Sequence, residues 1–317
     1  MPIAKRCGTV LTVLALLPLT ACSDSDPGGG DKDTVTLISP AWANGKANTA
    51  VAALLLEEEL GYEVRVLRLD EAEAWEALAD GSADAILEDW GHPKEERKYV
   101  QRQKSVVPAG DLGVTGRIGW YVPQYLADEH KDITNWNKLN KYADLFATDK
   151  TGDKGQLNEG DRSFVTHDES LIKNLGLDYQ AVFLGSENAQ MAEMRERAAK
   201  EQPFLTYWWR PHWIETEVPL AEVSLPTYTT GCADREAMVK CGYPSTKLQK
   251  YLNADFAEDG GDAARFLKNF NWTEDDQNTV AKMIVKEKLD EREAAERWVK
   301  RPPQIWRTWF MGTGGND

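Results

Sequence analysis

The sequence predicts an α/β protein of two lobes, each a mostly parallel sheet flanked by helices, with a ligand cleft between the lobes. Strand and helix patterns alternate near the start of the chain and again in its middle, with short joints between them. The chain has 317 residues, which is too long for one ordinary small hydrophobic core. A run of helical patterns closes the chain, and we expect these helices to pack on the first lobe.

The first lobe is predicted from its alternating pattern. Short apolar stretches predict strands, and longer stretches that stop at Gly61 and Gly81 predict the helices between them. Strand, helix, strand, helix and strand with short joints predict a parallel sheet wrapped by helices. The predicted segments are strand 35–38, helix 46–60, strand 62–69, helix 71–79 and strand 83–87.

The middle of the chain repeats this alternation, whereas its end is predicted to be helical. Residues 122–212 form the second lobe, and residues 34–121 plus 213–317 form the first, so the chain crosses between the lobes twice. Gly110, Gly113, Gly116 and Gly119 are predicted to mark turns before a crossing strand. The other predicted segments are helices 168–175 and 186–200, strands 180–184 and 203–207, and helices 247–254, 262–270, 274–288 and 291–299.

The N-terminus carries the pattern of an exported protein. Lys5 and Arg6 precede an apolar stretch over 10–19 that is too short to span a bilayer, which predicts a signal peptide over residues 1–21. Leu19-Thr20-Ala21-Cys22 resembles the lipobox of bacterial lipoproteins. This resemblance implies a diacylated Cys22 and a protein anchored at the outer face of the cytoplasmic membrane; in an ordinary secretory signal Cys22 would be incidental. Residues 22–33 are then a flexible tether, rich in Ser, Asp and Gly.

Charge and cysteine content limit the possible partners. Removing residues 1–21 deletes two basic and no acidic residues from a formal charge of −15, which leaves −17. Such a surface repels nucleic acid, so no nucleic-acid partner is expected. Cys232 and Cys241 remain in a compartment where disulfides persist, and we expect them to be bonded, with two reduced thiols as the alternative. Their spacing fits no common zinc site.

Tryptophans gather where strands should end. The chain has 12 Trp but only 8 Phe, and Tyr207 to Trp213 read Tyr-Trp-Trp-Arg-Pro-His-Trp. Ligand crevices of open parallel sheets lie outside the carboxyl ends of the strands. An indole face attracts a quaternary ammonium, although core packing is the alternative for any single Trp. Because successive strand residues face opposite sides, one of Trp208 and Trp209 is predicted to be core. The positions expected to face one cleft are Trp42, Trp90, Trp120 and the pair Trp208 and Trp209.

Six short motifs, taken in order, point to one family. They are Ala41-Trp42-Ala43-Asn44, Gly81-Ser82-Ala83-Asp84 leading to Glu88-Asp89-Trp90, Gly119-Trp120-Tyr121-Val122-Pro123, Gly160-Asp161-Arg162-Ser163-Phe164, Asn174-Leu175-Gly176-Leu177 and Trp208-Trp209-Arg210-Pro211-His212-Trp213. From about residue 34 to 310 the chain resembles the substrate-binding proteins of glycine betaine/choline-type ABC importers. The resemblance implies a periplasmic-binding-protein-like fold that holds a trimethylammonium group in an aromatic box. By motif, the box is Trp42, Trp90 and Trp209, with Trp120 or Tyr121 as a fourth ring.

One motif departs from the family pattern, in which Gly-Asp-Pro-Ser-Trp is common. Here Phe164 replaces the Trp, which weakens any cation contact, and Arg162 adds a positive charge. If this loop encloses the ammonium, ligand choice could differ; otherwise Phe164 is core. For the polar end of the ligand, the helix N-terminus after Asn44 offers free N–H groups for a carboxylate. Asn44, His92 and His212 are candidate contacts, and capping or structural roles for them are equally open.

The sequence therefore predicts a receptor and not an enzyme. It shows no catalytic set and no metal-ligand pairing of its histidines, so no cofactor and no metal are expected. The resemblance implies a monomer that delivers a quaternary ammonium compatible solute, glycine betaine first and choline next, to an ABC permease for osmoprotection. The alternatives are a sugar receptor that uses Trp stacking and a surface-anchored hydrolase.

Overall fold

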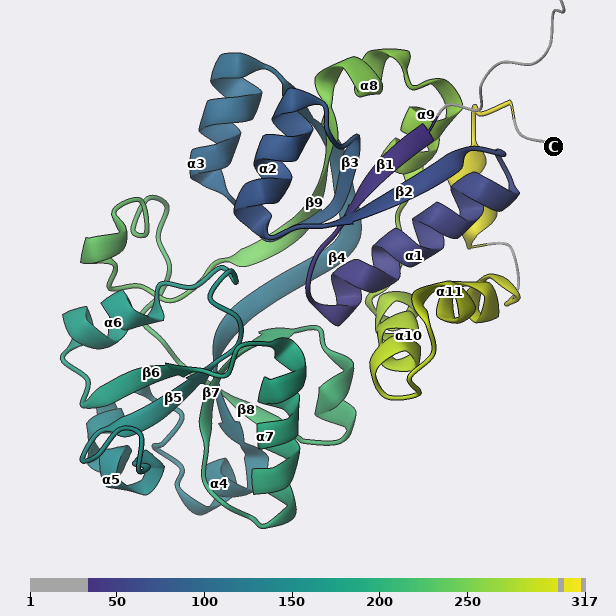
Figure 1. Ribbon diagram of the computed structural model, residues 1–317. Helices are drawn as coiled ribbons and strands as arrows, with labels where there is room; N and C mark the ends of the chain where they lie inside the picture. The colour runs from purple at the N-terminus through teal and green to yellow at the C-terminus, as the bar shows by residue number, and fades with distance from the viewer. Residues whose placement is uncertain (1–33, 302–304, 315–317) are drawn as a thin grey trace, which may run out of the picture. The chain divides into compact units, whose positions relative to one another are not determined.

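The computed structural model describes residues 34–301 and 305–314, and Figure 1 shows their course. The predicted signal peptide, Cys22 and the tether lie outside these described residues. No helix within the described ranges is long and apolar enough to cross a membrane.

One mixed sheet runs through the described part of the chain. Its strand order is β2-β1-β3-β9-β4-β7-β5-β6, and β8 pairs with β4 beside this path. The strands β1 to β3 pair in parallel, as do β5 to β7, while β4 runs antiparallel to β7, β8 and β9. The strands are β1 (Thr34–Ser39), β2 (Glu63–Arg68), β3 (Ala85–Asp89), β4 (Val106–Pro123), β5 (Gly155–Glu159), β6 (Tyr179–Phe183), β7 (Leu205–Arg210), β8 (Leu220–Val223) and β9 (Ser245–Asn253).

Side-chain caps set the start of several helices. Asp70, Ser186, Thr273 and Asp290 each accept a hydrogen bond from the backbone N–H three residues later, so α2, α7, α10 and α11 begin there. The helices are α1 (Ala43–Glu58), α2 (Glu71–Asp80), α3 (Pro93–Glu95), α4 (Gln124–Glu129), α5 (Ala143–Phe146), α6 (Asp168–Leu175), α7 (Glu187–Ala199), α8 (Ala254–Asp259), α9 (Gly261–Asn269), α10 (Glu274–Val285) and α11 (Glu291–Val299). Short 3₁₀ turns cover 136–142, 213–216, 236–238 and 306–310, and 96–103 form a π-helical segment.

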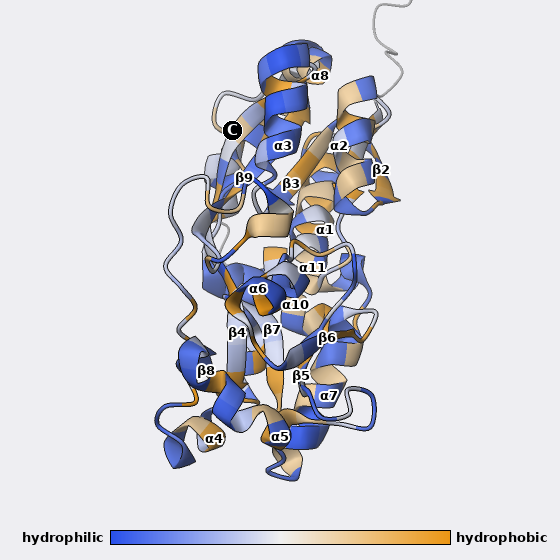
Figure 2. Ribbon diagram, turned by 90° about the vertical axis from the view of Figure 1, so that its left-hand side faces the viewer, coloured by the Kyte–Doolittle hydropathy of each residue, from blue (hydrophilic) through white to orange (hydrophobic). Residues whose placement is uncertain are grey.

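The strand β4 takes part in the cores of both lobes. Its Leu112 belongs to the core that contains α1 and α10, whereas its Trp120 belongs to a second core with Leu157 and Val223. Figure 2 shows mostly hydrophilic residues at the segment labelled α3 and hydrophobic residues on β3. The predicted two-lobed α/β class is therefore confirmed. The predicted lobe limits, which assign residues 34–121 and 213–317 to the first lobe, stay predictions. Ala221 and Val223 of β8 pack in the second core, although β8 belongs to the range assigned to the first lobe.

Two local predictions were wrong, and both concern the strands that cross between the lobes. Of residues 247–254, predicted as a helix, all but Ala254 lie in the strand β9, and the four glycines lie inside β4 and do not mark turns. Gly110 and Gly113 have φ of 87° and 93°, close to the register shifts where β4 bulges against β9. The apolar spacing of Leu248, Tyr251 and Leu252 imitates a helix because most of β9 is buried between β3 and β4, which removes the alternation of a half-exposed strand.

A buried lysine also obscured the β9 pattern. Lys250 is 1% exposed, and its Nζ donates to the carbonyl of Lys268 at 2.8 Å and to that of Phe270. These carbonyls belong to the end of α9 and the residue after it, so Lys250 satisfies acceptors that the helix cannot satisfy itself. Burial lowers the pKa of Lys250 to about 7. A charged residue type thus occupies a core position for a hydrogen-bonding reason.

The predicted disulfide between Cys232 and Cys241 is formed, with the two Cα atoms 6.3 Å apart. It closes part of the connection between β8 and β9. Tyr243, two residues beyond Cys241, donates its hydroxyl to Asp168 Oδ1 at 2.7 Å and accepts from the His167 N–H at 3.1 Å. The disulfide-bearing connection is therefore tied to the segment that follows β5.

Candidate ligand-binding site

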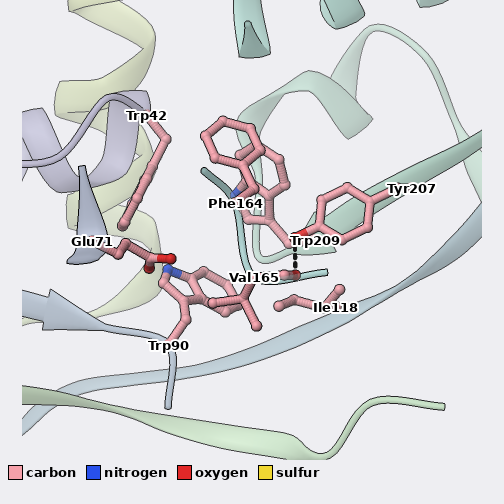
Figure 3. A pocket seen from close by; sticks show the side chains of 8 residues that line it. All are labelled: Trp42, Glu71, Trp90, Ile118, Phe164, Val165, Tyr207 and Trp209. Carbon is pink, nitrogen blue, oxygen red and sulfur yellow. Dashed lines mark hydrogen bonds between the residues drawn. The ribbon is translucent and has the colours of Figure 1, made fainter. Parts of the chain in front are cut away.

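A small aromatic pocket collects side chains from both lobes (Figure 3). Its empty space, counted together with the solvent at its opening, measures about 280 Å³. Most of the lining residues lie at or just after the carboxyl end of a strand, as expected for an open parallel sheet. The lining residues are Trp42, Glu71, Trp90, Ile118, Phe164, Val165, Tyr207 and Trp209.

The buried carboxylate of Glu88 holds two of the indoles. Glu88 Oε1 accepts from Trp42 Nε1 at 2.6 Å and from Trp90 Nε1 at 2.8 Å. Its Oε2 accepts from Asn48 Nδ2 at 2.5 Å and Gln277 Nε2 at 2.7 Å. Burial raises the pKa of Glu88 to about 7, and the four donors oppose that rise because they stabilise the ionised form. One carboxylate thereby fixes two walls of the pocket.

The close approach of Trp90 to β4 depends on a glycine. A Cβ atom at Gly116 would overlap the Trp90 ring, so a residue with a side chain would push the indole out of its place. Gly119 lies on the same strand, and a Cβ there would be 3.5 Å from the Tyr121 ring, which is an ordinary contact. The two glycines are therefore not equivalent: Gly116 leaves room for a pocket side chain.

The opposite wall consists of Phe164, Tyr207 and Trp209. The Phe164 ring packs edge to face against Trp42, with centroids 6.1 Å apart, and against Trp209, with centroids 5.6 Å apart. Tyr207 donates its hydroxyl to the Val165 carbonyl at 2.9 Å, as the dashed line in Figure 3 marks. Trp208 is fully buried, stacks on Trp209 at 4.3 Å and does not line the pocket, so Trp209 is the member of the pair that faces it.

Two of the predicted box residues lie elsewhere. Trp120 is fully buried in the second core, because on β4 it pairs with Val223 of β8. The ring of Tyr121 is covered by the guanidinium of Arg210, whose Cζ lies 4.8 Å from the ring centroid. Neither ring lines the pocket; Phe164 and Tyr207 provide its further aromatic rings.

The predicted polar contacts are engaged within the protein. Asn44 Nδ2 donates to Gln277 Oε1 at 2.9 Å, so Asn44 faces α10 and is not on the pocket. His212 Nδ1 accepts from the Ile214 N–H at 3.1 Å, which leaves Nε2 to donate to Glu187 Oε1 at 2.8 Å. Glu187 Oε2 accepts from the Ala43 N–H at 2.9 Å. The first N–H of α1, part of the helix end expected to bind a ligand carboxylate, is thus already paired.

Sequence reasoning missed Glu71, the first residue of α2, which lines the pocket. Glu71 Oε2 lies 3.2 Å from His92 Nε2, and His92 Nδ1 lies 2.5 Å from Asp89 Oδ1. Burial alone would lower the pKa of His92, but hydrogen bonds to Asp89 and Glu71 raise it to about 11, so the ring is an imidazolium. His92 therefore interacts with Glu71 and does not line the pocket itself.

No group of three or more His, Cys, Asp or Glu in the described ranges could hold a metal ion.

This architecture is that of a class, the two-lobed proteins with a periplasmic-binding-protein-like fold. Lactococcal OpuAC, in its closed-liganded conformation complexed with glycine betaine, matches with a TM-score of 0.70 and 21% identity over 88% of this chain and 99% of that chain. An ABC-transporter choline binding protein in complex with choline matches with a TM-score of 0.72 and 18% identity over 90% and 93%. At these identities the structures show the fold alone.

The chain belongs to the family of the substrate binding domain of ABC-type glycine betaine transport systems, whose family model matches residues 33–301. The trimethylamine N-oxide-binding protein of Pelagibacter ubique (strain HTCC1062) is 23% identical over 260 residues, which cover 78% of this chain and 82% of the relative. A glycine betaine/carnitine transport binding protein of Listeria monocytogenes is 27% identical over 128 residues, 40% of this chain and 38% of the relative. The family predicted from the motifs is confirmed.

Replacing Glu88 with Gln should weaken both the fold and the pocket. The Gln side chain keeps the size but has one acceptor oxygen, so two of the four N–H donors lose their partner. We expect the free energy of unfolding to fall by about 2 kcal/mol, the range for hydrogen bonds to a charged group. Denaturant unfolding measures this loss, with the exposed Glu63→Gln as the control for a lost charge. Equal stability of the two variants would contradict this role of Glu88.

The substitution Gly116→Ala should lower ligand affinity by displacing the Trp90 ring. Inserting a methyl group into a packed site costs about 1–3 kcal/mol. In contrast, Gly119→Ala on the same strand should leave affinity within about twofold of the original protein, because its Cβ meets no overlap. Calorimetric titration of both variants with the same trimethylammonium solute makes the comparison, and matching affinities would show that Trp90 does not depend on Gly116.

Proposed function

We propose that this chain is the extracytoplasmic receptor of an ABC importer and that its pocket binds the trimethylammonium group of a small compatible solute. The box consists of Trp42, Trp90, Phe164, Tyr207 and Trp209. The observation that carries the proposal is the convergence of these five rings, from both lobes, on one small and mostly apolar cavity. A cation without N–H groups gains little from hydrogen-bonding sites and much from aromatic faces.

The expected energies are sufficient for a transport receptor. Desolvated aromatic rings contribute roughly 1–2 kcal/mol each to a bound cation, so three or four rings account for about 3–8 kcal/mol. A micromolar dissociation constant corresponds to roughly 8 kcal/mol. Phe164 is the weakest cation partner among the rings. Its edge-to-face contacts with Trp42 and Trp209 also place it between these two indoles.

The ligands named for the similar proteins also support a trimethylated nitrogen as the group that the pocket binds. Glycine betaine, choline, carnitine and trimethylamine N-oxide all carry a nitrogen with three methyl groups, and these are the ligands named for the proteins that this chain resembles. A sugar would need several planar polar groups beside the rings, whereas Glu71 is the one charged side chain among those that line the pocket. The pocket therefore favours a methylated ammonium over a sugar.

Loss of one indole should reduce affinity for a trimethylammonium solute. We expect Trp209→Ala to cost about tenfold or more and Trp209→Phe to cost less, because Phe keeps an aromatic face. The neutral isostere of choline, 3,3-dimethylbutanol, should bind much more weakly than choline itself. Calorimetry of residues 23–317 measures these affinities, with a hexose as negative ligand and Trp136→Phe, outside the pocket, as control. Equal affinity for the neutral isostere would mean that the rings form only a hydrophobic wall.

We also propose that Cys22 anchors the protein in the membrane, on the strength of the lipobox-like motif alone. The expected diacyl modification holds a protein stably, whereas one acyl chain holds it only marginally. The variant Cys22→Ala should be released into the soluble fraction or remain uncleaved. Fractionation and mass spectrometry of the N-terminus check this, and a processed, acylated variant in the membrane fraction would contradict it.

A further inference from the structure

The pocket contains one carboxylate whose hydrogen bonding is incomplete. Glu71 is 8% exposed and lines the space among the rings, where Figure 3 shows its carboxylate beside Trp90. Its Oε2 is engaged by His92 Nε2, while its Oε1 has no hydrogen-bond partner among residues 34–301 and 305–314. An acceptor oxygen without a protein partner at an apolar pocket is open to a donor or a positive charge from a ligand.

One neighbour favours the ionised form of this carboxylate. Burial raises the pKa of Glu71, and the charges of Asp89 and Asp70 raise it further, whereas the adjacent His92 opposes the rise by a hydrogen bond and by its positive charge. His92 is itself held between two acids, Glu71 and Asp89. With Glu71 ionised, one imidazolium therefore faces two carboxyl groups beside the pocket.

Donors for a ligand carboxylate, in contrast, are scarce around the pocket. The indole N–H groups of Trp42 and Trp90 both point to Glu88, and the Ala43 N–H donates to Glu187. The guanidinium of Arg162 lies 3.9 Å from the Phe183 ring centroid and does not line the pocket. Trp209 Nε1 is buried without a partner, and this single neutral donor is all that the lining indoles still offer to an anion.

We infer that Glu71 makes the site selective for net charge: it favours a trimethylammonium cation that carries a hydroxyl, as in choline, over zwitterions such as glycine betaine. This inference rests on the proposed function. A hydroxyl donates to the free oxygen of Glu71, and the cationic head is attracted by its charge. A ligand carboxylate in the same space is repelled by Glu71 and finds no cation among the lining side chains. The order differs from the one that the sequence favours, in which glycine betaine comes first.

The test compares ligand preference in the original protein with that in Glu71→Gln. Calorimetry measures choline, glycine betaine and trimethylamine N-oxide at one pH and one salt concentration. We expect choline to bind the original protein about tenfold or more tightly than either zwitterion, the scale of one screened charge interaction. Glu71→Gln keeps the size, removes the charge and should weaken choline about tenfold while leaving glycine betaine unchanged or tighter.

The control is Glu73→Gln, which removes the same charge from an exposed position in the same turn of α2 and should leave the preference intact. Tighter binding of either zwitterion than of choline by the original protein would overturn the inference. Equal losses for all three ligands in Glu71→Gln would overturn it as well, since the residue would then be structural. Absence of binding by every trimethylammonium solute would instead overturn the proposed function, and with it the inference.

Discussion

The pocket depends on a single buried carboxylate, that of Glu88. An ionised carboxylate in the interior is unfavourable unless donors replace its water, and Glu88 receives four from the protein. Two of these donors are the indole N–H groups of Trp42 and Trp90, and the others come from α1 and α10. The requirement to satisfy Glu88 therefore fixes the loop after β1, the end of β3 and the position of α10 together. Because both indole N–H groups are used up, the two rings present only their carbon faces to a ligand.

A second carboxylate, that of Glu187, connects the two walls of the pocket. It lies at the start of α7 and accepts from the first N–H of α1 and from His212. The helix α1 follows Trp42, and His212 follows Trp209 by three residues, so this one side chain joins the segments that carry both rings. The negative charge at the N-terminus of α1 is also favourable for the helix dipole. The anion that the sequence suggested for this helix end is thus a part of the protein.

The sequence predicted the elements whose pattern is local and failed where burial changes the pattern. Strand β1 and helices α2, α6, α9 and α11 were found within two residues, because caps, glycines and apolar spacing mark them. Strand β9 was not, since a strand buried on both sides and containing Lys250 has no alternation to detect. For the site, the rule on carboxyl ends of strands located Trp42, Trp90 and Trp209. Trp120 does not line the pocket, because it lies within β4 and its ring packs in the second core.

Glu71 shows why the charge of a site is harder to predict than its aromatic walls. An acidic residue in the first turn of a helix is common, because it favours the helix dipole, so its presence there carries no signal of function. Its meaning comes from partners that are distant in the chain: His92, which it contacts, and the rings of Trp90 and of β7 that line the same pocket. The two acids near the rings then differ in one respect. Glu88 accepts four hydrogen bonds from the protein, whereas Glu71 keeps one oxygen without a protein partner at the pocket, where a ligand can reach it.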